Sequence, residues 1–196
     1  MSSININKEY NFSLKKFIIA FKKGYSKLYR QSQRKNFTIS KKYYRKGYDA
    51  CIDDFLKNGI KDVQAYEIFF QKNDVQNLYI DIYTNTGLIF YNWYKKNYET
   101  FIGKQEDTDN VVDTFFRNYA INSTFNKQTS VQATSIKSVE KLFSKMLLDK
   151  DFVEDSLEGK SKRLHKQLDK RAIWEARRIV KTETTLASNL GVNQGA

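Results

Sequence analysis

The chain has 196 residues, enough for one domain or one and a half with a buried core. Its 34 lysines and arginines exceed its 22 acidic residues, and the net charge of +12 favours a polyanionic partner such as nucleic acid or an anionic membrane surface. The many Lys, Asn, Ile and Tyr residues and the absence of proline also fit a low-GC genome, so charge alone identifies no partner.

The sequence lacks the residues that several reaction classes need. Cys51 is the only cysteine and His165 the only histidine, so one chain can build neither a disulfide framework nor a Cys/His zinc site. No glycine-rich phosphate loop occurs, and we expect no cofactor and no nucleotide-dependent chemistry. No apolar run approaches the roughly 20 residues that span a bilayer, and the first residues lack a secretion signal. We therefore expect a protein that is used without export.

The first predicted helix covers about residues 14–28, after a polar segment over 1–12 that we expect to be loose. Lysines cover the side of this helix opposite its apolar stripe. Such a basic amphipathic helix can bind a membrane or a partner, but a core helix with a solvated back is the commoner case and is preferred. The stripe consists of Leu14, Phe17, Ile18, Phe21, Tyr25 and Leu28.

A second helix is predicted over about 40–57, with Asn58-Gly59 as its stop signal. Its first turns mix cations with tyrosines, a combination that can grip phosphates while rings stack on bases. The simpler interpretation is that the tyrosines are buried and the cations only solvate the helix. The cations are Lys41, Lys42, Arg45 and Lys46. A short helix is predicted over 63–71.

The segment 77–98 fits two structures. Apolar and aromatic residues on both sides of Thr84-Asn85-Thr86-Gly87 allow a β-hairpin over 78–94. The same residues keep near-helical steps, which suits a buried central helix. Because the rest of the chain is helical, we favour the helix. An acidic, polar break is expected over 103–109.

The remaining segments complete an all-α prediction of an elongated, multi-helix assembly. A helix over 111–125 is followed by a polar stretch, 126–134, that is typical of a connection. This stretch is the best internal boundary, dividing an N-terminal helical region (1–126) from a C-terminal region (127–196). The helical period returns over 136–147 and again in a last helix over about 168–190.

The last helix has two contrasting sides. Glu183 falls in the middle of an apolar side, where a carboxylate must be paired or hydrogen-bonded, because a bare buried charge costs several kcal/mol. Thr182 and Thr184 flank it and can add hydroxyl hydrogen bonds. We interpret the triplet as a structural joint and keep a catalytic glutamate as the alternative. The apolar side has Ala176, Ile179, Val180, Leu186, Ala187 and Leu190, and the opposite, cationic side has Trp174, Arg177, Arg178 and Lys181.

The pattern of this helix resembles the signature of the phage head-morphogenesis family, the Mu F-like minor head proteins. The matching residues are Ala176, Ile179, the basic Lys181, Thr182-Glu183-Thr184, Ala187, Asn189 and Gly191. The resemblance covers about residues 130–196, and the preceding helices agree with the family in architecture alone. It implies a virion protein without catalytic activity that acts near the portal vertex in head assembly and in DNA packaging or delivery.

Two departures from the family pattern stand out. Lys181 occupies a position where the family commonly has Arg, whose forked donors could hold a carboxylate. Family members also continue past the motif into a compact segment, whereas this sequence stops at Ala196. The chain is then a short or processed version, or its motif helix is completed by another chain.

The resemblance and the charge together give a set of expected sites and partners. The partners are the portal protein, other head proteins and double-stranded DNA bound without sequence preference, in the virion and, during assembly, in the host cytoplasm. We expect no small-molecule substrate, no metal and no catalytic residue, and membrane binding is disfavoured. The alternatives are a stand-alone nucleic-acid-binding module and a Mg²⁺-dependent nuclease or transferase that uses Glu183. The expected DNA contacts are Lys41, Lys42, Arg45, Lys46, Arg177, Arg178 and Lys181, and the structural motif residues are Thr182, Glu183, Thr184, Asn189 and Gly191.

Overall fold

A computed structural model describes residues 3–59, 63–102 and 109–196, with side chains described over 15–59, 65–97 and 111–196. These residues form no β-strand, which confirms the all-α prediction and the helix rather than the hairpin over 78–94. The predicted break at 103–109 lies outside the described residues except for Asp109. The elements are α1 (Ser3–Asn58), the 3₁₀ helix η1 (Val63–Phe69), α2 (Lys72–Ile102), α3 (Asp109–Leu147), α4 (Lys150–Val153) and α5 (Leu157–Gly195).

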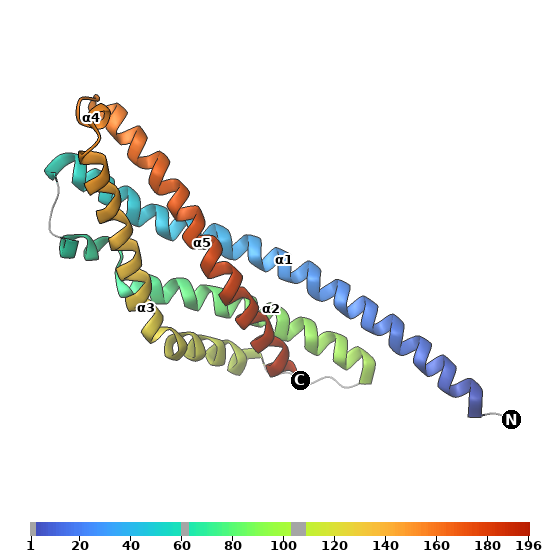
Figure 1. Cartoon of the computed structure of the whole chain (residues 1–196). Coiled ribbons are helices and arrows are strands. Elements are labelled where there is room, and N and C mark those ends of the chain that lie inside the picture. Colours follow the sequence, from blue (N-terminus) through green and yellow to red (C-terminus); the bar gives the residue numbers. More distant parts are fainter. Residues whose placement is uncertain (1–2, 60–62, 103–108) are drawn as a thin grey trace.

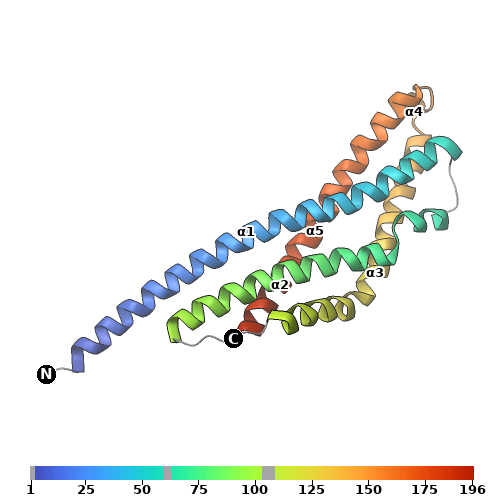
Figure 2. The same cartoon turned by 180° about the vertical axis from the view of Figure 1, so that it is seen from behind.

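The molecule is elongated, and α1 runs along its whole length (Figure 1). Helix α5 crosses α1 and packs against both α1 and α2, and α2 also packs against α3. Seen from behind, α2 lies between α1 and the first half of α3 (Figure 2). Helices α1 and α5 run in opposite directions, since Tyr25 contacts Ser188 and Arg45 contacts Asp169. The C-terminal helix therefore has a long partner on one side and the α2–α3 pair on another.

Helix α1 is a single helix, so the prediction of two helices with a loose 1–12 segment is wrong from Ser3 onward. Ser32 and Asn36, between the two predicted helices, and Ser40, at the start of the second, recur every four residues, and all three are buried. Small polar residues thus continue the packing face of α1 between its two apolar stripes. The predicted stop is confirmed: Gly59 has a φ of +74°, and its amide donates to the carbonyl of Phe55 at 2.9 Å.

Helix α3 is also continuous, so 126–134 is not a connection, and the boundary placed at 126/127 coincides with no break in secondary structure. Gln128, Val131 and Gln132 are buried, which gives this polar stretch a packing face. The Thr134 hydroxyl donates to the carbonyl of Ser130 at 2.7 Å, inside the helix itself. Hydroxyl-rich residues can remain helical when they bond their own backbone in this way.

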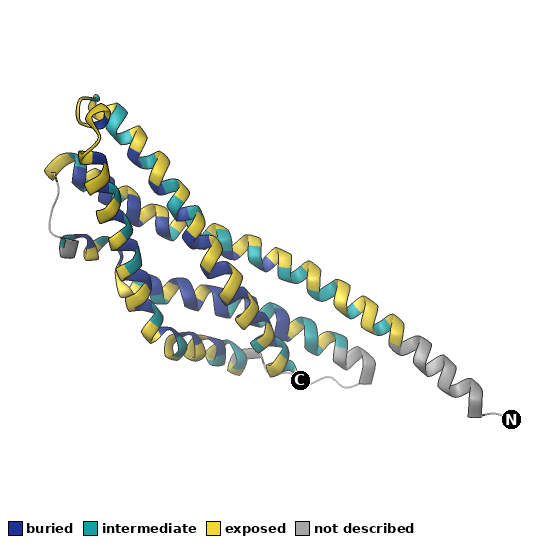
Figure 3. Cartoon of the chain, in the orientation of Figure 1, coloured by how far each residue is buried: buried dark blue, intermediate teal, exposed yellow. Residues whose placement is uncertain are grey.

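The core lies where the C-terminal half of α1 meets η1, α2, α3 and α5, and Figure 3 shows buried residues concentrated there. Aromatic rings build much of it: Phe55 stacks on Phe143 with ring centroids 4.2 Å apart, and Tyr48 meets Phe70 edge-on at 5.2 Å. Tyr44 and Tyr48 are buried, so their rings cannot stack on bases as one interpretation of the sequence suggested. The simpler interpretation, in which these tyrosines belong to the core, is confirmed for Tyr44 and Tyr48.

Two glycines allow close packing around α2: Gly191 of α5 approaches the α2 backbone, and Gly87 of α2 approaches the ring of Phe116 of α3. A Cβ on Gly191 would lie 2.5 Å from the carbonyl oxygen of Gly87, and a Cβ on Gly87 would lie 2.5 Å from the ring of Phe116. Only glycine allows such an approach without moving a helix. Gly191, predicted as a motif residue, therefore positions α5 on α2.

Among the described residues, no helix has the length and apolar character needed to cross a lipid bilayer.

Candidate functional site

The carboxylate of Glu183 is buried at the meeting point of α2, α3 and α5. Both of its oxygens lie 2.9 Å from the Lys127 ammonium, and the Tyr83 hydroxyl donates to Oε2 at 2.8 Å. The Lys127 ammonium also lies 5.6 Å from the ring centroid of Tyr79. Burial, reinforced by the negative charge of Glu183, raises the pKa of Tyr83, which keeps its hydroxyl protonated as a donor. The expectation that Glu183 has partners is confirmed.

Thr184 connects the same helix to α1. The Asn36 side-chain amide donates to the hydroxyls of Thr184 and Thr86, both at 2.9 Å, and this group is buried. One amide thus ties α1, α2 and α5 together. Thr182 is exposed, and its hydroxyl donates to the carbonyl of Arg178 in its own helix. Two residues of the triplet therefore point inward and one outward.

Further motif positions continue the α1–α5 contact. The Tyr25 hydroxyl lies 3.0 Å from the Ser188 hydroxyl and donates to the side-chain oxygen of Asn189 at 3.2 Å. Tyr29 and Thr185 are joined by a hydroxyl hydrogen bond of 2.7 Å. Side chains of the motif region thus reach α1, α2 and α3, so these helices share the motif helix as a neighbour.

Two details of the motif helix, the exposure of Leu186 and the helix limits, differ from what the sequence suggested. Leu186, predicted on the apolar side, is 42% exposed. Helix α5 begins at Leu157 and ends at Gly195, beyond both predicted limits. Lys181 is exposed and has no ion pair among the described residues, and Lys127 supplies the cation that Glu183 needs. An arginine at position 181 is thus not required to hold Glu183.

The sequence interpretation missed a second buried carboxylate, Glu175. Arg171 lies 2.6 Å from one of its oxygens and Arg178 3.2 Å from the other. Both guanidinium groups also contact Trp174, at 4.4 and 5.3 Å from the ring centroid. Glu175 precedes Glu183 by eight residues, a spacing that places both on one side of a helix, and this periodicity was the available signal. Arg178, an expected DNA contact, is therefore engaged within the chain.

The other expected DNA contacts are surface cations with different degrees of pairing. Arg45 binds Asp169 through two hydrogen bonds of 2.7 Å, and Lys46 lies 4.0 Å from Asp74. These carboxylates offset part of the two positive charges. No ion pair within the described residues engages the remaining expected contacts, which are Lys41, Lys42, Arg177 and Lys181.

The unpaired cations lie along the seam between α1 and α5. A hollow of about 410 Å³, here named the α1–α5 basic groove, has Arg30 and Arg34 on one side and Arg177 and Lys181 on the other. Phe37 borders this groove and also the neighbouring hollow that contains Lys41, Lys42, Arg45 and Lys46. The structure therefore places the predicted α1 cations, with Asp49 among them, beside the groove that holds Arg177 and Lys181, and it adds Arg30 and Arg34, which the sequence interpretation missed.

Helix α1 supplies most of this charge. The segment 10–48 contains twelve lysines and arginines and no acidic residue. A row of cations with no acidic residue in the same segment creates a positive potential that extends into the solvent, and Asp169 and Asp74 of other helices offset part of it at Arg45 and Lys46. The cations are Lys15, Lys16, Lys22, Lys23, Lys27, Arg30, Arg34, Lys35, Lys41, Lys42, Arg45 and Lys46.

The part of the chain that the structure describes contains no group of three His, Cys, Asp or Glu side chains placed to hold a metal ion. His165, predicted on the surface, is partly exposed, and its Nδ1 lies 3.1 Å from Asp49. Comparison of the chain with family models, with curated proteins and with solved structures found no match.

Proposed function

We propose that the chain is a minor protein of a phage head, acting at the portal vertex in head assembly and in DNA packaging or delivery. The observation that carries the proposal is the role of the motif residues in the fold. Glu183 bonds Tyr83 of α2 and Lys127 of α3, and Thr184 and Asn189 bond Asn36 and Tyr25 of α1. Motif residues that hold helices together indicate that the sequence signature reflects the fold, which agrees with a family of structural proteins.

The environment of Glu183 supports a structural role over a catalytic one. The Glu183 side chain is 5% exposed, and its oxygens are occupied by Lys127 and Tyr83. A catalytic carboxylate must reach a substrate or a metal-bound water. In this proposal Glu183 holds helices together, and the apolar side of α5 serves the core.

The basic seam between α1 and α5 supports the proposed contact with double-stranded DNA. Arg30, Arg34, Arg177 and Lys181 face the same groove and have no ion pair among the described residues. Lysine and arginine side chains that neutralise phosphates release counterions, which gives sequence-independent and strongly salt-dependent binding. Such binding suits a protein that meets packaged DNA of any sequence.

Purified particles test the proposed location. We expect the protein in proheads and mature virions, at a copy number far below that of the major shell protein, and retained in fractions enriched in portal. Quantitative mass spectrometry of intact and disrupted particles measures both quantities. Absence from the particles, or a copy number equal to that of the shell protein, would contradict the proposal. DNA binding without portal association would instead favour a stand-alone nucleic-acid-binding module.

Removing charge from the α1–α5 basic groove should weaken DNA binding and flatten its salt dependence. In a variant with Arg34→Gln, Arg177→Gln and Lys181→Gln, we expect the slope of log affinity against log salt to fall by about 2.7, because each lost phosphate contact removes about 0.9. Fluorescence anisotropy with a duplex of mixed sequence measures the slope.

The matched control removes three exposed lysines that lie outside the groove, by Lys57→Gln, Lys72→Gln and Lys150→Gln. This variant has the same net charge but should keep nearly the wild-type slope. Equal losses in the two variants would show that total charge, and not the groove, determines binding.

A further inference from the structure

A second basic groove lies between α3 and α5, and none of the residues that line it was assigned to DNA by the sequence interpretation. Lys137, Lys141 and Lys145 of α3 border a hollow of about 420 Å³, with Arg171 of α5 on the other side. Leu168 contributes apolar surface to the hollow. No acidic residue borders it, and we name it the α3–α5 basic groove.

The three lysines form a row along α3. They recur every four residues, so they share one side of the helix and successive Cα atoms rise by about 6 Å. All three are exposed, and none has an ion pair within the described residues. Like charges four residues apart disfavour a helix, so the row costs stability unless an anion offsets it. Arg171 differs, because it shares the single carboxylate of Glu175 with Arg178.

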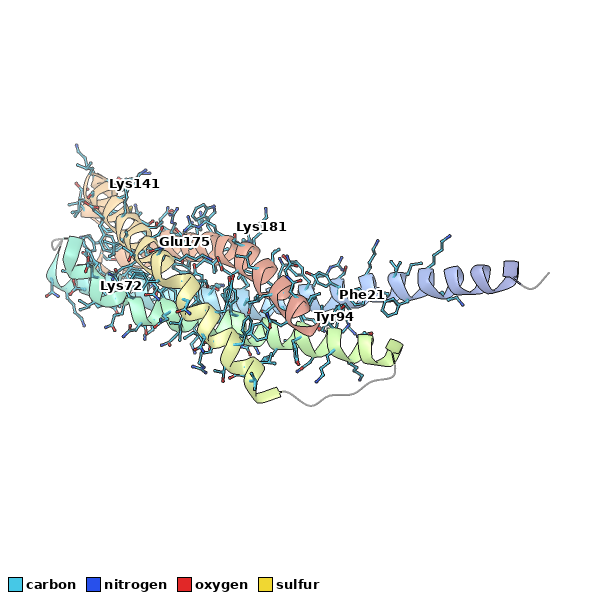
Figure 4. All side chains as sticks on the ribbon, turned by 90° about the horizontal axis from the view of Figure 1, so that it is seen from below. Phe21, Lys72, Tyr94, Lys141, Glu175 and Lys181 are labelled. Carbon is cyan, nitrogen blue, oxygen red and sulfur yellow. The ribbon has the colours of Figure 1, made fainter. Side chains whose placement is uncertain are left out.

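This groove faces the same side of the molecule as the α1–α5 basic groove. Figure 4 shows Lys141 and Lys181 along one side of the bundle and Lys72 on the other. Helix α5 contributes Arg171 to one groove and Lys181 to the other. The stretch of α5 between these two residues has Trp174, 50% exposed, in contact with two arginines. Cations therefore continue across α5 from one groove to the other.

We propose that the α3–α5 basic groove is a second binding site for the phosphate backbone of the same DNA, so that the duplex lies across α5 and contacts both grooves. The proposal rests on the DNA binding proposed above and adds Lys137, Lys141 and Lys145 to it. The groove is open and its lysines stand in a row, an arrangement that fits an extended chain of phosphates. A single small phosphate would be held better by donors that converge on one point from several sides.

The test is the salt slope of duplex binding in a variant with Lys137→Gln, Lys141→Gln and Lys145→Gln. We expect the slope to fall by about 2.7, and by about 5.4 when the three substitutions of the α1–α5 groove are added. Exposed lysine and glutamine have similar helix propensities, so the fold should persist, and circular dichroism checks it. The Lys57, Lys72 and Lys150 variant is again the control of equal charge.

The possible outcomes separate this proposal from the proposed function. A wild-type slope in the α3 variant, with a reduced slope in the α1–α5 variant, overturns the second site and leaves the DNA-binding role intact. Failure of the wild-type protein to bind duplex overturns both. Polyglutamate tests the competing occupant, an acidic protein. If the α3 variant loses polyglutamate binding but keeps wild-type duplex binding, the groove serves an acidic protein and the proposal is wrong.

Discussion

Replacing Lys127 with Met should destabilise the protein by about 3–5 kcal/mol, more than any change at Glu183 that keeps its shape. The reason is the unequal burial of the two partners: the Glu183 side chain is 5% exposed and the Lys127 side chain 35%. Without Lys127, a buried carboxylate keeps only the hydrogen bond from Tyr83. Since whole domains have about 5–15 kcal/mol of stability, this loss would bring the protein close to unfolding at room temperature.

Glu183→Gln is the informative comparison. The remaining Lys127 ammonium can turn toward water, and the amide oxygen can still accept from Tyr83, so the expected loss is only about 1–2 kcal/mol. Urea unfolding followed by circular dichroism measures both variants. Arg163→Gln, which removes an exposed ion pair with Asp155, should cost no more than about 1 kcal/mol and serves as the control. Wild-type stability in both Lys127 and Glu183 variants would contradict the structural joint and favour the catalytic alternative.

Raising the pH above 10 should unfold the protein within about one to two pH units. Five tyrosines of the core have a raised pKa, chiefly because burial disfavours the phenolate, and nearby carboxylates add to the effect. Unfolding restores the ordinary pKa of 10.0, so the stabilisation is complete below that pH and is lost as the pH rises above it. The five are Tyr43, Tyr44, Tyr48, Tyr79 and Tyr83.

The size of this effect follows from proton linkage. Each tyrosine that ionises only in the unfolded chain removes about 1.4 kcal/mol per pH unit, so five together remove about 7 kcal/mol per unit. Circular dichroism and tyrosinate absorbance, recorded along the same titration, should change together. Early tyrosinate absorbance from the same five residues in a fully helical protein would contradict their burial.

Tyr44→Phe tests the assignment at one residue. The Tyr44 hydroxyl is buried and has no hydrogen-bond partner among the described residues, so its loss should change neutral-pH stability little. The alkaline slope should nevertheless fall by about 1.4 kcal/mol per pH unit. An unchanged slope would mean that Tyr44 ionises equally well in the folded and unfolded protein.

The sequence predicts those features that depend on local spacing and on elementary charge energetics. Apolar residues at helical steps locate every long helix at least in part, and Asn58-Gly59 marks the end of α1 correctly. The need of Glu183 for partners follows from the cost of burying a bare carboxylate. Which partners it has does not follow, because Lys127 and Tyr83 lie 56 and 100 residues away in the chain.

The two wrongly predicted helix breaks, in α1 and in α3, share one physical cause. Ser32, Asn36 and Ser40 in α1, and Gln128 and Gln132 in α3, are residue types that usually mark loops, yet here they face other helices. Asn36, for example, is useful inside the bundle because Thr86 and Thr184 offer it acceptors. Periodicity that counts only apolar residues cannot detect such a face. Glu175 was missed for the same reason, because a charged residue is not counted in an apolar stripe. Ion pairs with two arginines of its own helix make its burial tolerable.

The unbroken length of α1 gives the molecule a mechanical property. Fifty-six residues of helix span about 84 Å, and the N-terminal end projects well past α2 in Figure 1. Aromatic contacts of Phe21 with Trp93 and Tyr94 join α1 to α2. From these contacts α1 continues as one unbroken helix to Asn36. A force applied to the N-terminal end of α1 would be transmitted along this one helix to Asn36, whose hydrogen bonds join α1 to α2 and α5.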